Sequence, residues 1–314
     1  GLDKLCRLKF LCLDGNKIKK IKGLENLTSL EKLILSRNQI EKIEGLNSLV
    51  NLKHLDLSRN KIKKIEGLDS LVNLKYLWIY GSMIKKIEGL SKLANIEELW
   101  LMYSDIEKIE GLDNLISLKY LKLFGNKITK IEGLDNLVNL TTLDLSDNQI
   151  TKIEGLNRFV NLKWLSLKEN QITKIEGLDS LTCLKSLTLH KNRIEKIEGL
   201  DKLQRLDYLC LSSNRITKIE GVDNLTRLDV LELGGNQIKK IKNILHLRNL
   251  RRIHVENNPI EYIPPHIQRF LNGVSNRHNI YNENQSVHDY NIQKSLMESI
   301  NNLLSYPNGC DVFI

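Results

Sequence analysis

The sequence predicts an α/β-type solenoid in which short parallel strands from successive repeats line a concave face. Three observations support this prediction: a strict 22-residue period, alternating leucines within each unit, and an asparagine at a fixed place after them. A solenoid grows by adding units and needs no single large core. The apolar residues that open the twelve units are Leu8, Leu30, Leu52, Leu74, Ile96, Leu118, Leu140, Leu162, Leu184, Leu206, Leu228 and Leu250.

The leucines within one unit predict a strand with one buried face. In the unit that starts at Leu140, the side chains of Leu143 and Leu145 alternate with polar residues, as a half-buried strand requires. One short strand cannot bury its apolar face alone, so neighbouring units stack into a parallel sheet. We therefore expect a right-handed superhelix with a concave parallel sheet and a convex side of short 3-10 or irregular segments.

The asparagine after each strand has a structural interpretation. Its amide both donates and accepts hydrogen bonds, so a buried column of such amides can satisfy the backbone groups freed where each strand ends. The glycine of the following Ile-Glu-Gly-Leu phrase permits a tight turn. The column comprises Asn16, Asn38, Asn60, Asn126, Asn148, Asn170, Asn192, Asn214, Asn236 and Asn258.

The phrase Leu-x-x-Leu-x-Leu-x-x-Asn-x-Ile resembles the leucine-rich repeat. Its 22-residue length, with Ile-Glu-Gly-Leu after it, is similar to the bacterial internalins and to the leucine-rich regulatory subunit of protein phosphatase 1. The resemblance covers about four-fifths of the chain. It implies a binding solenoid but names no partner, because framework residues carry it while concave residues choose the partner.

We predict two regions. Residues 1–271 form the solenoid, with twelve full repeats from Leu8 after a partial repeat that begins at Gly1. Because the chain opens in mid-repeat, we expect further residues upstream that cap this end. Residues 272–314 form a C-terminal capping or tail region, whose Asn-rich sequence resembles the tails of leucine-rich-repeat proteins of giant amoebal viruses.

The C-terminal region contains two predicted helices. His266 to Leu271 form a short helix that begins near Pro265, and residues 273–287 are polar and irregular. A second, amphipathic helix lies near 289–304, with Ile292 and Leu296 on its apolar face. We favour the interpretation that this helix caps the last repeat, and the alternative is a helix that binds a partner.

Composition excludes several functional classes. The net charge of +9 comes from lysines that recur beside glutamates, as at Lys42 and Glu44, which indicates a solvated mixed surface and not a nucleic-acid site. No apolar run approaches the roughly 20 residues that cross a bilayer. The five cysteines are scattered, which favours an intracellular, cytoplasmic protein. No motif for a metal or another cofactor is present.

Aromatic residues concentrate on the predicted concave face. All three tryptophans occupy outward strand positions, and repeats four to six carry most of the neighbouring aromatic residues. We expect an exposed patch that binds a partner protein, because aromatic residues and methionine dominate interface hot spots. The alternative is cross-strand stacking that only supports the sheet. The candidate binding residues are Tyr76, Trp78, Tyr80, Trp100, Met102, Tyr103, Tyr120, Phe124 and Trp164.

The sequence therefore predicts a non-enzymatic protein–protein interaction module, monomeric or weakly self-associating. Cys210 and His190 lie on neighbouring predicted strands, but nothing supplies an oxyanion hole or a pocket for nucleophilic catalysis. A mainly structural or engineered scaffold is the alternative that remains. The framework asparagine becomes Ser82 and Ser104 beside the aromatic patch, which argues against a designed chain.

Overall fold

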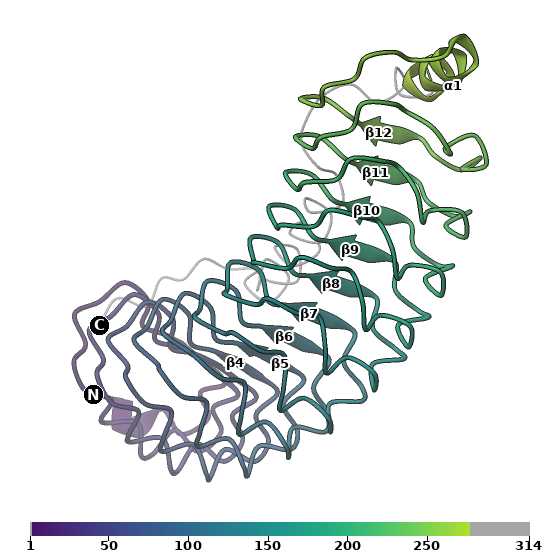
Figure 1. Cartoon of the computed structure of the whole chain (residues 1–314). Coiled ribbons are helices and arrows are strands. Elements are labelled where there is room, and N and C mark those ends of the chain that lie inside the picture. Colours follow the sequence, from purple (N-terminus) through teal and green to yellow (C-terminus); the bar gives the residue numbers. More distant parts are fainter. Residues whose placement is uncertain (1, 277–314) are drawn as a thin grey trace. The chain divides into compact units, whose positions relative to one another are not determined.

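The computed structural model describes residues 2–276, and residues up to Val274 belong to one compact unit. Twelve three-residue strands form a single sheet in chain order (Figure 1). A 3-10 helix, η1 (Leu2–Lys4), precedes the sheet and α1 (Pro265–Asn276) follows it. The strands are β1 (Phe10–Cys12), β2 (Lys32–Ile34), β3 (His54–Asp56), β4 (Tyr76–Trp78), β5 (Glu98–Trp100), β6 (Tyr120–Lys122), β7 (Thr142–Asp144), β8 (Trp164–Ser166), β9 (Ser186–Thr188), β10 (Tyr208–Cys210), β11 (Val230–Glu232) and β12 (Arg252–His254).

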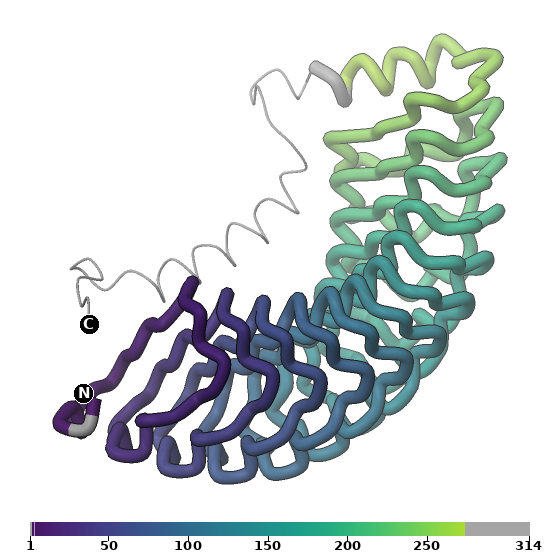
Figure 2. The backbone as a smooth tube through the Cα atoms, turned by 90° about the vertical axis from the view of Figure 1, so that its left-hand side faces the viewer, coloured from purple at the N-terminus to yellow at the C-terminus, as the bar shows by residue number. Residues whose placement is uncertain are grey.

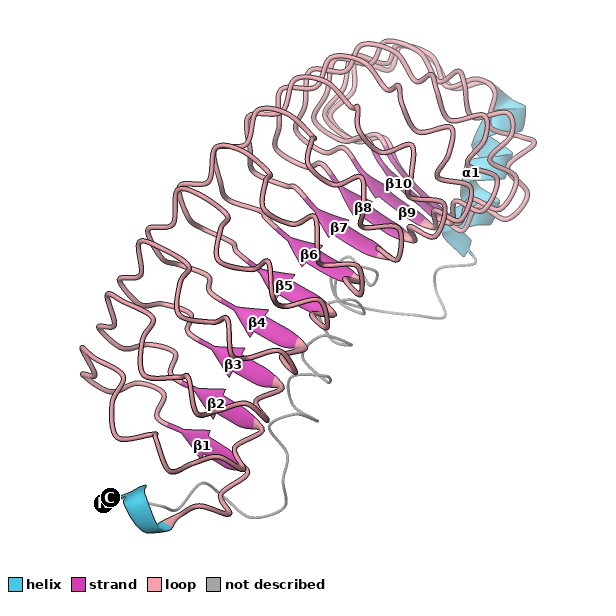
Figure 3. Cartoon of the chain, turned by 90° about the horizontal axis from the view of Figure 1, so that it is seen from below, coloured by secondary structure: helices cyan, strands magenta, loops and turns pink. Residues whose placement is uncertain are grey.

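The sheet is parallel and keeps the sequence period. Leu143 of β7 lies opposite Leu165 of β8, one 22-residue repeat further along. The repeats of this unit follow a curve (Figure 2), with the strands on its inner side and the turns on its outer side (Figure 3). This arrangement confirms the predicted solenoid with a concave parallel sheet.

The core consists of columns of leucine and isoleucine that continue from repeat to repeat. Each repeat contributes residues from its strand, from the turn after it and from the segment that leads to the next strand. Their burial removes apolar surface from water, which is the main favourable contribution to folding. In the seventh full repeat every one of these residues is at most 1% exposed: Leu140, Leu143, Leu145, Ile150, Ile153 and Leu156.

The buried asparagines form the predicted ladder. The Asn148 amide donates to the carbonyls of Leu123 and Leu145, both at 3.1 Å, and its Oδ1 accepts the Ile128 amide at 3.0 Å. One side chain thus joins two consecutive repeats and forms hydrogen bonds with backbone groups that the short strands leave unpaired.

The glycine of each turn is required by its surroundings. Gly177 has φ +68°, and a Cβ built there would lie 2.7 Å from the carbonyl oxygen of Ile153 in the preceding repeat. Both the left-handed backbone and the close approach of the preceding repeat favour glycine.

The C-terminal end of the core is covered by α1. Ile267 is 3% exposed, and Phe270 and Leu271 pack against the core. The helix continues to Asn276, so the expectation that residues from 273 are irregular is wrong for 273–276. A hydrogen bond from Gln268 Nε2 to Asn272 Oδ1, 2.9 Å long and one turn apart, supports this extension. The second helix predicted near 289–304 lies outside the described residues.

Candidate protein-binding surface

The candidate surface lies on β4–β6, where tryptophans from neighbouring strands meet. Trp78 and Trp100 are register partners, and their rings stack with centroids 4.4 Å apart and planes 9° from parallel. His54 meets the other face of Trp78 edge-on at 4.4 Å, and Lys122 Nζ lies 4.7 Å from the Trp100 ring centre. A continuous stack of four side chains therefore crosses strands β3 to β6.

This stacking corrects the expectation that the whole aromatic set is exposed. Trp78, Trp100 and Met102 are only 7%, 6% and 7% exposed. Each tryptophan ring covers one face of the other. An outward strand position predicts that a side chain leaves the core, but it does not predict burial by a side chain of the neighbouring strand. Cross-strand stacking, the alternative interpretation, therefore describes these two rings.

The accessible part of the surface surrounds the stack. Tyr103 is 57% exposed and Tyr120 is 42% exposed, whereas Tyr76, Tyr80 and Phe124 are half-buried. Tyr103 meets Phe124 edge-on at 4.7 Å. The tryptophans thus form a floor, and tyrosines and phenylalanine form its accessible margin.

Tyr103 has a left-handed backbone, as its equivalents have in the other repeats. Its φ is 49°, and the same position is left-handed at Arg59, Gly81, Gly125 and Asp147, so the conformation belongs to the repeat. A Cβ at Gly125 would lie 2.6 Å from Tyr103 Cδ1, so the tyrosine ring lies across that glycine. Tyr103 is distinguished by the large aromatic side chain that it exposes at this position.

The asparagine ladder is interrupted behind the same surface. In regular repeats an isoleucine amide donates to the asparagine of the next repeat, as Ile40 does to Asn60 at 2.9 Å. Ser82 and Ser104 occupy two of these positions, and among the described residues Ser82 Oγ is buried without a hydrogen-bond partner. These two repeats lack framework hydrogen bonds that the other repeats have.

Burial controls the charge of the groups beside the stack. Desolvation raises the pKa of Glu98 to about 7, although Lys122 and the Trp78 indole partly oppose this shift. Burial also lowers the pKa of Lys122. Burial, and then the nearby Lys32 charge, lower the pKa of His54 to about 3, so its imidazole is neutral at physiological pH.

A charged rim borders the surface. Glu97 Oε1 lies 2.9 Å from Lys75 Nζ and Glu97 Oε2 lies 2.7 Å from Lys119 Nζ. These two lysines hold the pKa of the Glu97 carboxyl below its usual value. Lys127 Nζ pairs in the same way with Asp105 at 2.7 Å. Polar rims of this kind surround many protein interfaces.

Trp164 is separated from the other candidates. It lies in β8 opposite Thr142 of β7 and Ser186 of β9, and it is half-buried. No aromatic ring within residues 2–276 stacks on it. The structure therefore brings eight of the nine candidates together on adjacent repeats and leaves Trp164 two strands away.

The thiol–imidazole pair does not have the features of an activated nucleophile. Cys210 Sγ donates to Glu232 Oε2 at 3.1 Å, and burial, followed by the Glu232 charge, raises the pKa of the thiol to about 12. A nucleophilic cysteine needs the opposite shift. Within residues 2–276 no group of three or more His, Cys, Asp or Glu side chains is placed to hold a metal ion.

Comparisons with known proteins define the family. Models of the leucine-rich repeat match residues 120–222, and models of paired leucine-rich repeats match 6–48, 28–70, 50–92 and 204–243. The structure of an internalin (InlF) from Listeria monocytogenes is 32% identical, covers 86% of this chain and 78% of its own, and has a TM-score of 0.78. The chain belongs to the leucine-rich-repeat family, which as a class provides concave binding surfaces.

Two further structures have the same fold. Internalin C2 from Listeria monocytogenes is 31% identical over 57% of this chain and 80% of its own, with a TM-score of 0.54. A leucine-rich-repeat protein of Leptospira interrogans is 24% identical over 88% and 90% of the two chains, with a TM-score of 0.56. No curated protein matches the sequence. No helix in the described part of the chain has the length and apolar character needed to cross a membrane.

Proposed function

We propose that this chain is a non-enzymatic protein–protein interaction module that binds a partner protein on its concave face, over β4–β6. One observation carries the proposal: an exposed Tyr103 extends from a stacked aromatic floor in the repeats where the framework asparagine is also missing. Folding alone favours neither feature, and departures from framework rules are concentrated where function requires them.

The surface suits an apolar segment of a partner with charges at its edges. Tyr76, Tyr80, Tyr103, Tyr120 and Phe124 would make the contacts, over a floor of tryptophan and Met102. Large aromatic side chains bury much area and lose little rotamer entropy, which makes them effective interface residues. The paired charges of Lys75, Glu97 and Lys119 would form the rim. Trp164 would be an outlying contact.

The test uses two substitutions taken from the chain itself. Tyr103→Asn places a residue that tolerates the left-handed backbone, as Asn257 does at the equivalent position of the last repeat. Tyr120→Thr copies Thr142 of the neighbouring strand. We immobilise the full chain and this double variant, and identify by mass spectrometry which proteins of the producing cell each retains. We expect retention of a specific partner to fall by about tenfold or more.

Tyr262→Ser is the matched control, because Tyr262 is 60% exposed and lies beyond the strands that carry the surface. Equal retention by the double variant and the control would contradict the proposed site. If neither the unaltered chain nor any variant retains a specific protein, the result favours the alternative of a mainly structural scaffold. Circular dichroism establishes that all three proteins are folded.

The proposal also includes an intracellular location, with Cys6 and Cys183 as free thiols.

A further inference from the structure

A second asparagine row runs along the flank of the solenoid, just before each strand. Its amides donate across the gap between repeats to the backbone of the preceding one. Asn73 Nδ2 reaches the Val50 carbonyl and Asn95 Nδ2 reaches the Val72 carbonyl, each at 2.9 Å. We call this row the flank ladder, formed by Asn51, Asn73, Asn95, Asn139, Asn161 and Asn249.

The flank ladder is interrupted in three consecutive repeats. Its positions hold Cys183, Arg205 and Arg227, and among the described residues neither arginine makes the ladder hydrogen bond. The neighbouring positions change in the same repeats: exposed Val50, Val72, Ile116, Val138 and Val160 give way to Thr182, Gln204 and Thr226.

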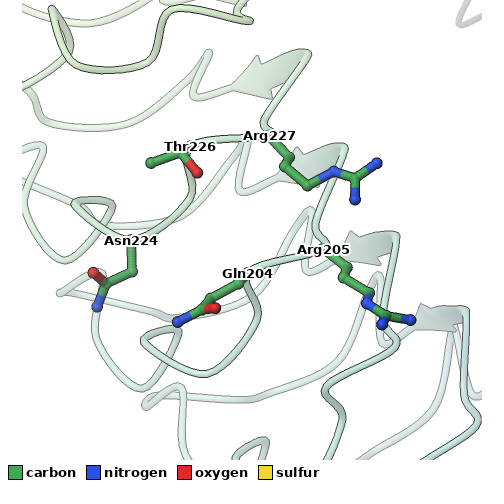
Figure 4. A pocket seen from close by; sticks show the side chains of 5 residues that line it. All are labelled: Gln204, Arg205, Asn224, Thr226 and Arg227. Atoms are coloured by element: carbon green, nitrogen blue, oxygen red, sulfur yellow. The ribbon is translucent and has the colours of Figure 1, made fainter.

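A pocket opens where the ladder is interrupted. It has a volume of about 490 Å³, and Gln204, Arg205, Asn224, Thr226 and Arg227 line it. Arg205 and Arg227 extend in the same direction from successive repeats, with the amides of Gln204 and Asn224 on the other side (Figure 4). The size falls within the range of small-ligand sites. Every lining side chain can donate a hydrogen bond.

The positive charge in this pocket is poorly neutralised. Arg205 Nη1 lies 3.5 Å from Cys183 Sγ, and no carboxylate of the described chain pairs with it. Arg227 Nε is 4.0 Å from Asp207 Oδ1. Arg251 on the next repeat differs, because it holds the Asp229 carboxylate through two bonds of 2.6 and 2.7 Å. Arg205 therefore has no carboxylate partner in the described chain, and Arg227 has only the long contact with Asp207, which leaves hydrogen-bond donors of both guanidinium groups for an external anion.

We propose that this flank pocket binds a phosphate group. Guanidinium groups match the oxygens of phosphate through paired hydrogen bonds, and two of them can hold a dianion. The Gln204, Asn224 and Thr226 side chains lie on the other side of the pocket, so the two guanidinium groups would supply the hydrogen bonds to the phosphate. The site is separate from the concave surface and does not depend on the function proposed for it.

The test measures binding of inorganic phosphate to the full chain by calorimetry at constant ionic strength. The key variant is Arg205→Asn/Arg227→Asn, which restores the flank ladder residue and should leave the unfolding midpoint equal or higher. We expect saturable one-site binding to the unaltered chain and a loss of affinity of about tenfold or more in this variant. Arg193→Gln/Arg215→Gln is the matched control, because it removes two exposed arginines from the turns of the same repeats, where Gln171 and Gln237 are natural equivalents.

Two further ligands sharpen the assignment. O-phosphoserine that binds more tightly than phosphate would indicate a phosphorylated protein as the source of the group, and equal binding would indicate a free phosphorylated molecule. Succinate that binds as tightly as phosphate would overturn the phosphate assignment. The site itself is overturned if phosphate does not saturate the unaltered chain, or if both double variants bind it equally well.

Discussion

Strands β4–β6 and β8–β10 present different side chains on the same framework. The first group carries stacked tryptophans with tyrosine and phenylalanine around them, and the second carries mainly Ser166, Ser186, Thr188 and Cys210. The leucines behind both groups are fully buried and pair in the same register. Because the fold accepts either set, folding alone does not explain the aromatic surface, which supports the proposed binding role.

Polar satisfaction does not separate the two groups. Trp100 Nε1 of the first group and Trp164 Nε1, Ser186 Oγ and Thr188 Oγ1 of the second are buried without a hydrogen-bond partner within the described chain. Ser166 Oγ of β8 lies 2.6 Å from Ser146 Oγ of the preceding repeat. The difference between the two groups therefore lies in their aromatic side chains and not in unmet hydrogen bonds.

The largest expected effect tests whether the framework is truly shared. Leu121→Ala in β6 and Leu187→Ala in β9 each empty a position that is 0% exposed. Each should lower the free energy of unfolding by about 2–5 kcal/mol, by a similar amount in the two strands. Urea unfolding followed by circular dichroism measures both. A large loss of unfolding free energy for only one of the two variants would contradict the comparison, because the leucine cores behind the two surfaces would then differ in stability.

The second prediction concerns pH and applies to the aromatic region alone. The pKa of Glu98 is raised to about 7 in the folded chain, above its ordinary value of 4.5. Its contribution to stability is therefore fully present below pH 4.5 and is lost as the pH rises through 7. The loss should be about 1–3 kcal/mol relative to Glu98→Gln, measured as unfolding free energy from pH 4.5 to 8.

Glu97→Gln is the control for the pH prediction. Lys119 and Lys75 lower the pKa of Glu97, so its contribution is present above pH 4.5 and is lost as the pH falls through the lowered value. Parallel pH profiles for the unaltered chain and Glu98→Gln between pH 4.5 and 8 would show that Glu98 is not desolvated.

The third prediction repairs the ladder behind the aromatic surface. Ser82→Asn should raise the free energy of unfolding by about 1 kcal/mol, because the amide can accept from Ile62 and donate to neighbouring carbonyls as Asn60 does. The reciprocal change behind β8, Asn170→Ser, removes the same kind of ladder bonds and should destabilise the second region by a similar amount. Thermal unfolding of both variants tests these two expectations. An unchanged unfolding midpoint for Ser82→Asn would mean that the missing ladder asparagine at position 82 costs no stability.

The smallest effect is expected on the convex side. Lys152 Nζ lies 3.6 Å from Glu154 Oε2 and 3.9 Å from Glu176 Oε1; the lysine is well exposed and both glutamates are half-buried. Such pairs contribute about 0–1 kcal/mol each. Lys152→Ala should therefore change the unfolding free energy by less than about 0.5 kcal/mol at moderate salt, in urea titrations. A larger loss would give the convex ion pairs a structural role.

The repeat framework could be predicted because a period repeated twelve times specifies strand register, core columns and the asparagine ladder. Side-chain packing along the sheet could not, because it depends on how Trp78 and Trp100 turn toward each other. The left-handed Tyr103 had a signal in the sequence, since glycine occupies its position in the neighbouring repeats at Gly81 and Gly125. The flank ladder also had a signal in the sequence, because asparagines recur every 22 residues before the strands. Its interruption at Arg205 marks the position of the pocket.

The most direct test of the account is oxidative footprinting of the chain with and without its captured partner. Hydroxyl radicals modify accessible aromatic side chains, and exposed tyrosines occur both on the concave surface and outside it. We predict that modification of Tyr103 and Tyr120 falls on binding while that of Tyr262 stays constant. Protection of Trp164 in β8, with Tyr103 and Tyr120 unchanged, would contradict the account by placing the partner on the serine-rich strands.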